Sequence, residues 1–269
     1  MSYSITGKTA IVTGSANGIG LAIARFFVDK GANVMFADMD EAKLEAEVGD
    51  EARAEGSVRM FSGDLREKLC IINLLSATMD AFDRIDILVN ASRMMRRSDP
   101  LNLSGDVVEE MLQQNLMTSL RMSQMTAKRM IAEAERNPDR SGPVGVIVNL
   151  SSIAAHRTQP QLLGYSIACA AVDQMTRSLA VALAPKGIRV NAVALGSVLS
   201  ASLQHALKDA PENRALIEAG TPLGRIAPAT ELVETVQFLA SDASGFMTGQ
   251  ILTVDGGRSL IDAVTAPSH

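Results

Sequence analysis

The chain has 269 residues, a formal net charge of −5 and a hydrophobic fraction of 47%, so it holds enough apolar material for one large domain. This composition excludes a disordered chain, and the longest uncharged stretch, 190–206, is too polar to span a membrane. The acidic balance and the absence of Trp argue against a nucleic-acid surface. We therefore expect a soluble protein with a small-molecule substrate, and neither a nucleic-acid nor a membrane partner.

Cysteine and histidine usage is sparse. Cys70 and Cys169 lie far apart in apolar helical patterns, and the histidines at 156, 205 and 269 have no metal-ligand spacing. The first residues lack the basic and then apolar layout of a signal peptide. We expect no metal site and a cytoplasmic location.

Short runs rich in Val and Ile alternate with longer segments of helical period. The predicted strands are Thr9–Thr13, Asn33–Ala37, Val58–Phe61, Ile87–Asn90, Gly145–Leu150, Arg189–Ala194 and Ile251–Val254. The predicted helices are 18–30, 40–55, 66–82, 104–136, 164–184 and 228–241. Strands that are separated by helices and apolar throughout form a parallel sheet covered on both faces, which predicts a doubly wound α/β fold in three layers.

No linker or repeat divides the chain, so we expect a single domain over residues 1–269. The segment 197–220 interrupts the alternation after a central strand and has its own helical pattern. Ligands of open α/β sheets bind at the carboxyl ends of the strands, so this insertion is interpreted as a substrate lid. The alternative is a surface excursion with a small helix of its own.

A glycine-rich turn joins the first strand to the first helix. It lies where a dinucleotide's pyrophosphate would meet backbone N–H groups and the positive end of a helix dipole. The alternative is a tight turn that needs glycine for backbone reasons alone. The predicted cofactor contacts in this turn are Gly14, Ser15, Asn17, Gly18, Ile19 and Gly20.

Asp38 ends the second strand, where a carboxylate can accept hydrogen bonds from the adenosine ribose and repel a 2′-phosphate. No Arg lies in the turn, and Met39 follows Asp38, so the pattern favours NAD over NADP. Asp64, after the third strand, is a candidate adenine contact. Each of the two carboxylates has an alternative role as a helix N-cap.

Several further motifs make the whole chain resemble the short-chain dehydrogenase/reductase family. They are Asp64-Leu65, Gln113–Leu116 with Asn115, Ile147–Ser152, Tyr165, Ile188–Val193, Pro222–Arg225, Thr248–Gln250 and Val254–Gly257. The resemblance implies a seven-stranded Rossmann-type sheet, a nicotinamide cofactor, and hydride transfer between an alcohol and a ketone. It also implies a homo-oligomer, commonly a homotetramer.

The resemblance assigns catalysis to Asn115, Ser152 and Tyr165, with Tyr165 as general acid and base and Ser152 holding the substrate oxygen. It extends the cofactor contacts to Leu65, Asn90, Ala91, Tyr165, Gly196 and Val198. The family's lysine, four residues after the tyrosine, is replaced by Cys169. A phenol of reference pKa about 10 is a poor base at neutral pH, and the lysine would lower that value.

Other departures also lie on the nicotinamide side. Arg93 replaces a glycine of the family's Asn-Asn-Ala-Gly, and Leu195 replaces a proline. The basic cluster Arg93, Arg96 and Arg97 either attracts an anionic substrate or is a solvated loop. Cys169 is either a small packing residue or a redox thiol.

These observations leave two functional hypotheses. One is an NAD(H)-linked oxidoreductase that acts on a secondary alcohol or ketone and is weakened by loss of the lysine. The other is an inactive dinucleotide-binding sensor, scaffold or partner subunit. In either case we expect a symmetric dimer or tetramer that buries the Met-rich stretch 111–130 and the run 238–257.

Overall fold

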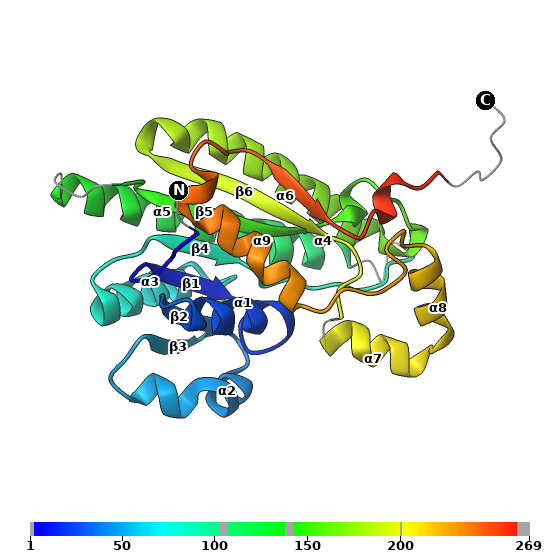
Figure 1. Ribbon diagram of the computed structural model, residues 1–269, viewed down its shortest axis with the longest axis horizontal. Helices are drawn as coiled ribbons and strands as arrows, with labels where there is room; N and C mark the ends of the chain where they lie inside the picture. Colours follow the sequence, from blue (N-terminus) through cyan, green and yellow to red (C-terminus); the bar gives the residue numbers. More distant parts are fainter. Residues whose placement is uncertain (1–2, 103–106, 138–141, 200, 263–269) are drawn as a thin grey trace.

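A computed structural model describes residues 3–102, 107–137, 142–199 and 201–262, and its centre is one seven-stranded sheet (Figure 1). All strands are parallel, in the order β3-β2-β1-β4-β5-β6-β7. They are β1 (Thr9–Thr13), β2 (Asn33–Asp38), β3 (Val58–Ser62), β4 (Ile87–Asn90), β5 (Gly145–Ser152), β6 (Ile188–Leu195) and β7 (Ile251–Val254).

The predicted fold class is confirmed. The central strands are apolar along their whole length because helices cover both faces of the sheet, so every side chain of β1, β4, β5 and β6 is buried. β5 and β6 run one or more residues past their predicted ends, because they pair with each other over eight residues. This extension places Ser152 on the last residue of a buried strand.

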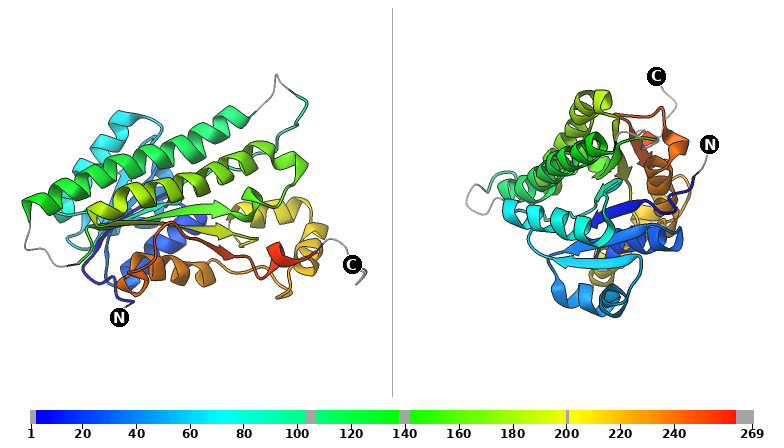
Figure 2. Two further views of the ribbon diagram at one scale, coloured as in Figure 1. Left: turned by 90° about the horizontal axis from the view of Figure 1, so that it is seen from above. Right: turned by 90° about the vertical axis from the view of Figure 1, so that its left-hand side faces the viewer.

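Helices form a layer on each side of the sheet (Figure 2). One face packs against α1 (Gly18–Asp29), α2 (Glu41–Arg53) and α9 (Thr230–Ala240). The other packs against α3 (Lys68–Phe82), α5 (Thr118–Arg136) and α6 (Leu163–Leu183). The chain changes direction at β1, which pairs with both β2 and β4, so the crevice for a ligand opens at the carboxyl ends of β1 and β4.

The helix predicted over 104–136 is interrupted, and its first residues, 104–106, lie outside the described residues. A short α4 (Val108–Met111) continues through a widened π-turn, η1 (Leu112–Met117), into α5. Thr118 Oγ1 donates to the carbonyl of Gln113 at 3.0 Å, and Ser119 Oγ donates to that of Asn115 at 2.8 Å. These hydroxyl groups bind carbonyls at the turn, which is where Asn115 lies.

Two helices follow β6, α7 (Ala201–Asp209) and α8 (Glu212–Ala219), at the end of the molecule toward which the strands point (Figure 1). They account for the helical pattern in the segment 197–220, of which Ser200 and the side chain of His205 lie outside the described residues. One further segment, Pro160–Lys186, is long and apolar enough to cross a membrane by length and composition. Its α6 portion contributes buried side chains to the core under β5 and β6.

Candidate active site

The glycine turn brings β1 against the loop that follows β4. Gly14 has a φ of +68°, and a Cβ atom there would lie 2.6 Å from the Cα of Ser92. Gly18, with a φ of +58°, faces open space, and α1 begins at this residue without an acidic side chain in its first turn. Ser15, Ile19 and Gly20 are buried beneath the turn. The turn therefore offers free N–H groups and a positive helix end to an anion.

Asp38 supports this turn from the end of β2. One carboxylate oxygen accepts from the backbone N–H of Ala16 at 3.0 Å, and the other accepts from that of Asp40 at 3.1 Å. The N-cap of α2 is Asp40, which accepts from the N–H of Lys43 at 3.1 Å. The capping role considered for Asp38 therefore belongs to Asp40, and Asp38 lies beside the turn as the cofactor interpretation requires.

Asp64 has a partner that the sequence analysis missed. Arg66 donates from Nε to both carboxylate oxygens at 3.0 Å and from Nη2 to one of them at 2.6 Å. These hydrogen bonds hold the pKa of Asp64 below its usual range. Its neighbour Leu65 is buried.

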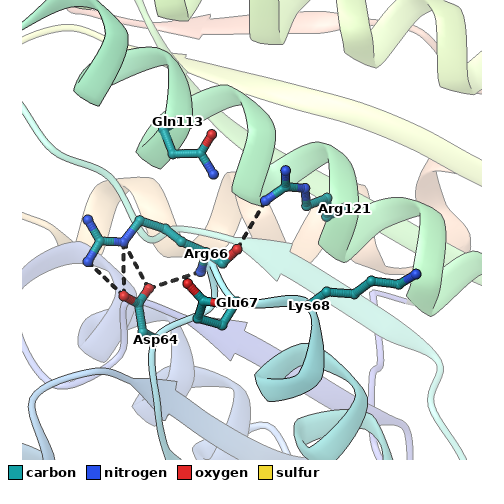
Figure 3. A pocket seen from close by; sticks show the side chains of 6 residues that line it. All are labelled: Asp64, Arg66, Glu67, Lys68, Gln113 and Arg121. Carbon is teal, nitrogen blue, oxygen red and sulfur yellow. Dashed lines mark hydrogen bonds and ion pairs between the residues drawn. The ribbon is translucent and has the colours of Figure 1, made fainter.

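The Asp64–Arg66 pair lies on one wall of a cavity of about 560 Å³ (Figure 3). Arg121 of α5 donates to the backbone carbonyl of Arg66 at 3.0 Å and closes the opposite wall. The spacing of two residues in an Asp-x-Arg sequence was the available signal for the ion pair. The cavity is lined by Asp64, Arg66, Glu67, Lys68, Gln113 and Arg121.

The structure brings Ser152 and Tyr165 together. Tyr165, in the first turn of α6, is only 4% exposed, and the side chains of Ser152 and Cys169 are close enough to its hydroxyl to influence its pKa. Burial raises the pKa of Tyr165 above its usual value, while the charge of Arg93 and the Ser152 hydroxyl lower it in part. Ser152 is fixed by its own bonds, because its Oγ donates to the carbonyl of Leu195 at 3.3 Å and accepts from the N–H of Ala154 at 3.2 Å.

Arg93 contacts the tyrosine from the loop after β4. Its Nη1 donates to the Tyr165 oxygen at 3.0 Å, across 72 positions of sequence. The basic cluster proposed for this loop is therefore divided, since Arg96 pairs instead with Glu110 of α4 at 2.6 Å. Arg97 is exposed.

Cys169 lies one helical turn after Tyr165 and is 5% exposed. Burial raises the pKa of the thiol to about 11, so it is neutral at physiological pH. This favours the packing interpretation over the redox one. A void of about 10 Å³ adjoins the thiol, lined by Ser92, Arg93, Asn115, Ser119, Leu150, Tyr165, Cys169 and Val172.

Asn115 does not touch Tyr165 in any described contact but holds the loop that carries Arg93. Its Nδ2 donates to the carbonyl of Met94 at 2.8 Å, and its Oδ1 accepts from the Met94 N–H at 2.7 Å. Thr13 holds the same loop on its other side, where its Oγ1 accepts from the N–H groups of Ala91 and Ser92 at 3.0 and 3.1 Å. Sequence reasoning missed Thr13, although a hydroxyl residue directly before the glycine turn was a signal.

The remaining candidate residues lie at or just beyond the carboxyl ends of β4 and β6. Asn90 is buried and donates to Asn149 at 2.8 Å, so it braces β4 against β5. Gly196 follows β6, where a Cβ atom would lie 2.6 Å from that of Asp255, and the buried Val198 pairs with Ala227. Within the described ranges, no group of three His, Cys, Asp or Glu side chains is arranged to hold a metal.

Comparison with known proteins identifies the family. A family profile described as "Enoyl-(Acyl carrier protein) reductase" matches residues 14–259. The chain is 35% identical to a (2S)-[(R)-hydroxy(phenyl)methyl]succinyl-CoA dehydrogenase subunit of Thauera aromatica, over 95% of this chain and 98% of that protein. It is 33% identical to D-threitol dehydrogenase of Mycolicibacterium smegmatis, over 96% and 95% of the two chains.

Among solved structures, a 7α-hydroxysteroid dehydrogenase in complex with NADH and 7-oxo glycochenodeoxycholic acid matches with a TM-score of 0.85. The identity is 27%, and the match covers 95% of each chain. The chain belongs to the short-chain dehydrogenase/reductase family, whose members are oxidoreductases that use nicotinamide dinucleotides.

Proposed function

We propose that this protein is an NAD(H)-linked oxidoreductase that interconverts a secondary alcohol and a ketone. The observation that carries the proposal is the pair of neighbouring hydroxyls, Ser152 at the end of β5 and Tyr165 in the first turn of α6, at the carboxyl end of the sheet. The named relatives are dehydrogenases of a hydroxyacyl thioester, a polyol and a steroid alcohol, which supports alcohol and ketone chemistry.

The residues present fit a dinucleotide. The pyrophosphate would lie on the N–H groups of the glycine turn at the start of α1, and Asp38 would accept from the adenosine ribose hydroxyls. The carboxylate of Asp38 would repel a 2′-phosphate, and the next residue, Met39, offers no compensating charge. When bound, the nicotinamide dinucleotide supplies the hydride for ketone reduction or accepts it in alcohol oxidation.

Side chains of this protein would carry out the proton transfer. Ser152 would hold the substrate oxygen by a hydrogen bond, and Tyr165 would donate its phenolic proton to that oxygen as the ketone becomes an alcohol. In the reverse direction the Tyr165 phenolate would take the alcohol proton, and the two electrons would leave as hydride. Asn115 would act as a positioning residue, since the oxygen and the nitrogen of its side-chain amide both bind the backbone of Met94.

The proposal is tested by NADH binding and turnover. The chain lacks Trp, so the fluorescence of the bound reduced nicotinamide is measured without indole background. We expect saturable NADH binding and turnover on a panel of secondary alcohols and ketones. Tyr165→Phe should abolish turnover and leave NADH binding in place, whereas Tyr3→Phe should change neither.

A second candidate is a dinucleotide-binding protein without catalytic activity. It is favoured by the small void beside Tyr165 and by the neutral thiol at position 169. NADH binding without turnover on any tested substrate would support this candidate and overturn the enzyme proposal.

We further propose a single domain over 1–269 with a lid at 197–220, a cytoplasmic location, and a symmetric dimer or tetramer. Apolar side chains left exposed on α6, Ile167 and Val181, support an interface on this helix face. Light scattering that reports a monomer at micromolar concentration would contradict the oligomer.

A further inference from the structure

We propose that Arg93 is a catalytic residue whose guanidinium stabilises the phenolate of Tyr165 and so takes the place of the lysine expected at position 169. The inference rests on the proposed function, because it concerns the acid and base of that reaction. It assigns to the loop after β4 a charge that the family pattern places on α6.

The contact has the geometry that this role needs. Arg93 Nη1 lies 3.0 Å from the Tyr165 oxygen, and a guanidinium is a donor only, so the tyrosine oxygen must accept. A hydrogen bond donated by a cation is stronger when its acceptor is an anion. The contact therefore favours the phenolate over the phenol, and it does not engage the phenolic proton.

The charges around Tyr165 single out Arg93. Among the residues that the structure describes, Arg93 and Cys169 are the titratable groups that act on Tyr165, and the thiol is neutral at physiological pH. Ser152, at the end of β5, adds the effect of a neutral hydroxyl, which lowers the pKa of Tyr165. Asp173, one turn beyond Cys169, acts on the thiol, and His156 acts on Asp173. Arg93 is thus the positive charge that partly offsets the effect of burial, which still leaves the pKa of Tyr165 above its usual value.

The loop that presents Arg93 is fixed on both sides. Asn115 binds both backbone polar groups of Met94, and Thr13 binds the N–H groups of Ala91 and Ser92. An arginine held by its backbone loses less entropy when its side chain binds than one on a mobile loop would lose. An arginine at the same position on a loosely held loop would lower the pKa of Tyr165 much less.

The pKa of Tyr165 tests the inference directly and needs neither substrate nor cofactor. The chain has two tyrosines and no tryptophan, so in a Tyr3→Phe background the ultraviolet absorbance of tyrosinate reports Tyr165 alone. We expect Arg93→Met to raise this pKa by about 1–3 units, the usual effect of one nearby opposite charge. Arg93→Lys should recover part of the shift.

Arg96→Met is the matched control, because it removes from the same loop a charge that is paired with Glu110. It should leave the titration of Tyr165 unchanged. If the folded Arg93→Met protein titrates at the pH of its parent, or if Tyr165 titrates in neither protein before alkaline unfolding, the inference is wrong.

Enzyme activity provides a second, independent test of the role of Arg93. Alcohol oxidation near neutral pH should fall about 10- to 1,000-fold in Arg93→Met and recover as pH rises, because the fraction of phenolate limits the rate. A pKa shift without any turnover would overturn the proposed function, and with it the catalytic role of Arg93, and leave only its electrostatic effect on Tyr165. Turnover with no pKa shift would leave the proposed function in place and overturn the role of Arg93.

Discussion

A lysine introduced at position 169 should lower the free energy of unfolding while Arg93 is present. The same lysine should cost less stability once Arg93 is removed. The Cys169 thiol is 5% exposed, and the void beside it measures about 10 Å³, far less than a lysine side chain fills. Overpacking of this kind costs about 1–3 kcal/mol. The new ammonium would also share the surroundings of Tyr165 with the guanidinium of Arg93.

Like charges about 5 Å apart at an effective dielectric constant near 20 repel by roughly 3 kcal/mol. Part of this repulsion is offset by the carboxyl of Asp173, which lies one turn along α6 and has an Oδ1 without a hydrogen-bond partner among the described residues. We therefore expect Cys169→Lys to lower the free energy of unfolding by about 2–5 kcal/mol. In the Arg93→Gly background, both the crowding and the repulsion diminish, so the same change should cost about 2 kcal/mol less.

The assay is a double-mutant cycle in urea at constant protein concentration, with the parent, both single variants and the double variant. Cys169→Met in both backgrounds is the matched control, since it adds comparable length without charge. If the two changes add within about 0.5 kcal/mol, Arg93 and residue 169 do not share one site. In that case the replacement of the lysine by Arg93 loses its structural basis.

Three further predictions concern the residues around the proposed dinucleotide site. NAD(H) should bind at least tenfold more tightly than NADP(H), about 1.4 kcal/mol, and Asp38→Ala should narrow that gap; equal dissociation constants by calorimetry would contradict this. Gly14→Ala should cost about 1–2 kcal/mol for its positive φ alone and weaken NADH binding, whereas Gly56→Ala, which meets no neighbour within 4 Å, should do neither. Because Arg66 lowers the pKa of Asp64 in the folded state, the pair stabilises the protein above the unfolded pKa of about 3.9, and this stability is lost as pH falls through the lower folded value. Arg66→Met should thus have a lower urea midpoint near neutral pH that approaches the parent's under acid conditions, and parallel pH curves would contradict the assignment.

The sheet was predictable because each strand carries its own signal. β1, β4 and β7 have the predicted bounds, since their apolar runs stop at Gly, Asn or Asp residues. The ends of β5 and β6 were less predictable, because Ser151, Ser152 and Leu195 join the strands through pairing with each other. Local patterns do not reveal how far a neighbouring strand extends.

The π-turn could not be predicted from apolar periodicity. Its position depends on hydrogen bonds that the hydroxyls of Thr118 and Ser119 give to backbone carbonyls, and such hydroxyls equally well face solvent in an ordinary helix. A single helix over 104–136 was therefore the reasonable expectation. The widened turn is nevertheless important, because Asn115 lies in it and hydrogen-bonds the backbone of the loop after β4.

The candidate site was predictable as a set of residues, and its interactions were not. The motifs placed Ser152 and Tyr165 at one end of the sheet, where the two hydroxyls are close neighbours. The Arg93 contact depends on the direction of a long side chain that leaves a loop 72 residues earlier. Sequence reasoning identified Arg93 as a departure from the family and left open whether the basic cluster that contains it attracts an anionic substrate or is a solvated loop.

Electrostatic stabilisation depends on the distance between charge and oxygen, and not on which element provides the charge. A lysine on the tyrosine's own helix has a fixed spacing, so it leaves a motif that can be recognised in sequence. An arginine on a separate loop leaves no such motif, and it needs that loop to be held rigidly, as Asn115 and Thr13 hold it here. Once the charge comes from Arg93, position 169 is released from carrying one, and a small apolar side chain such as Cys169 fits the little space that remains.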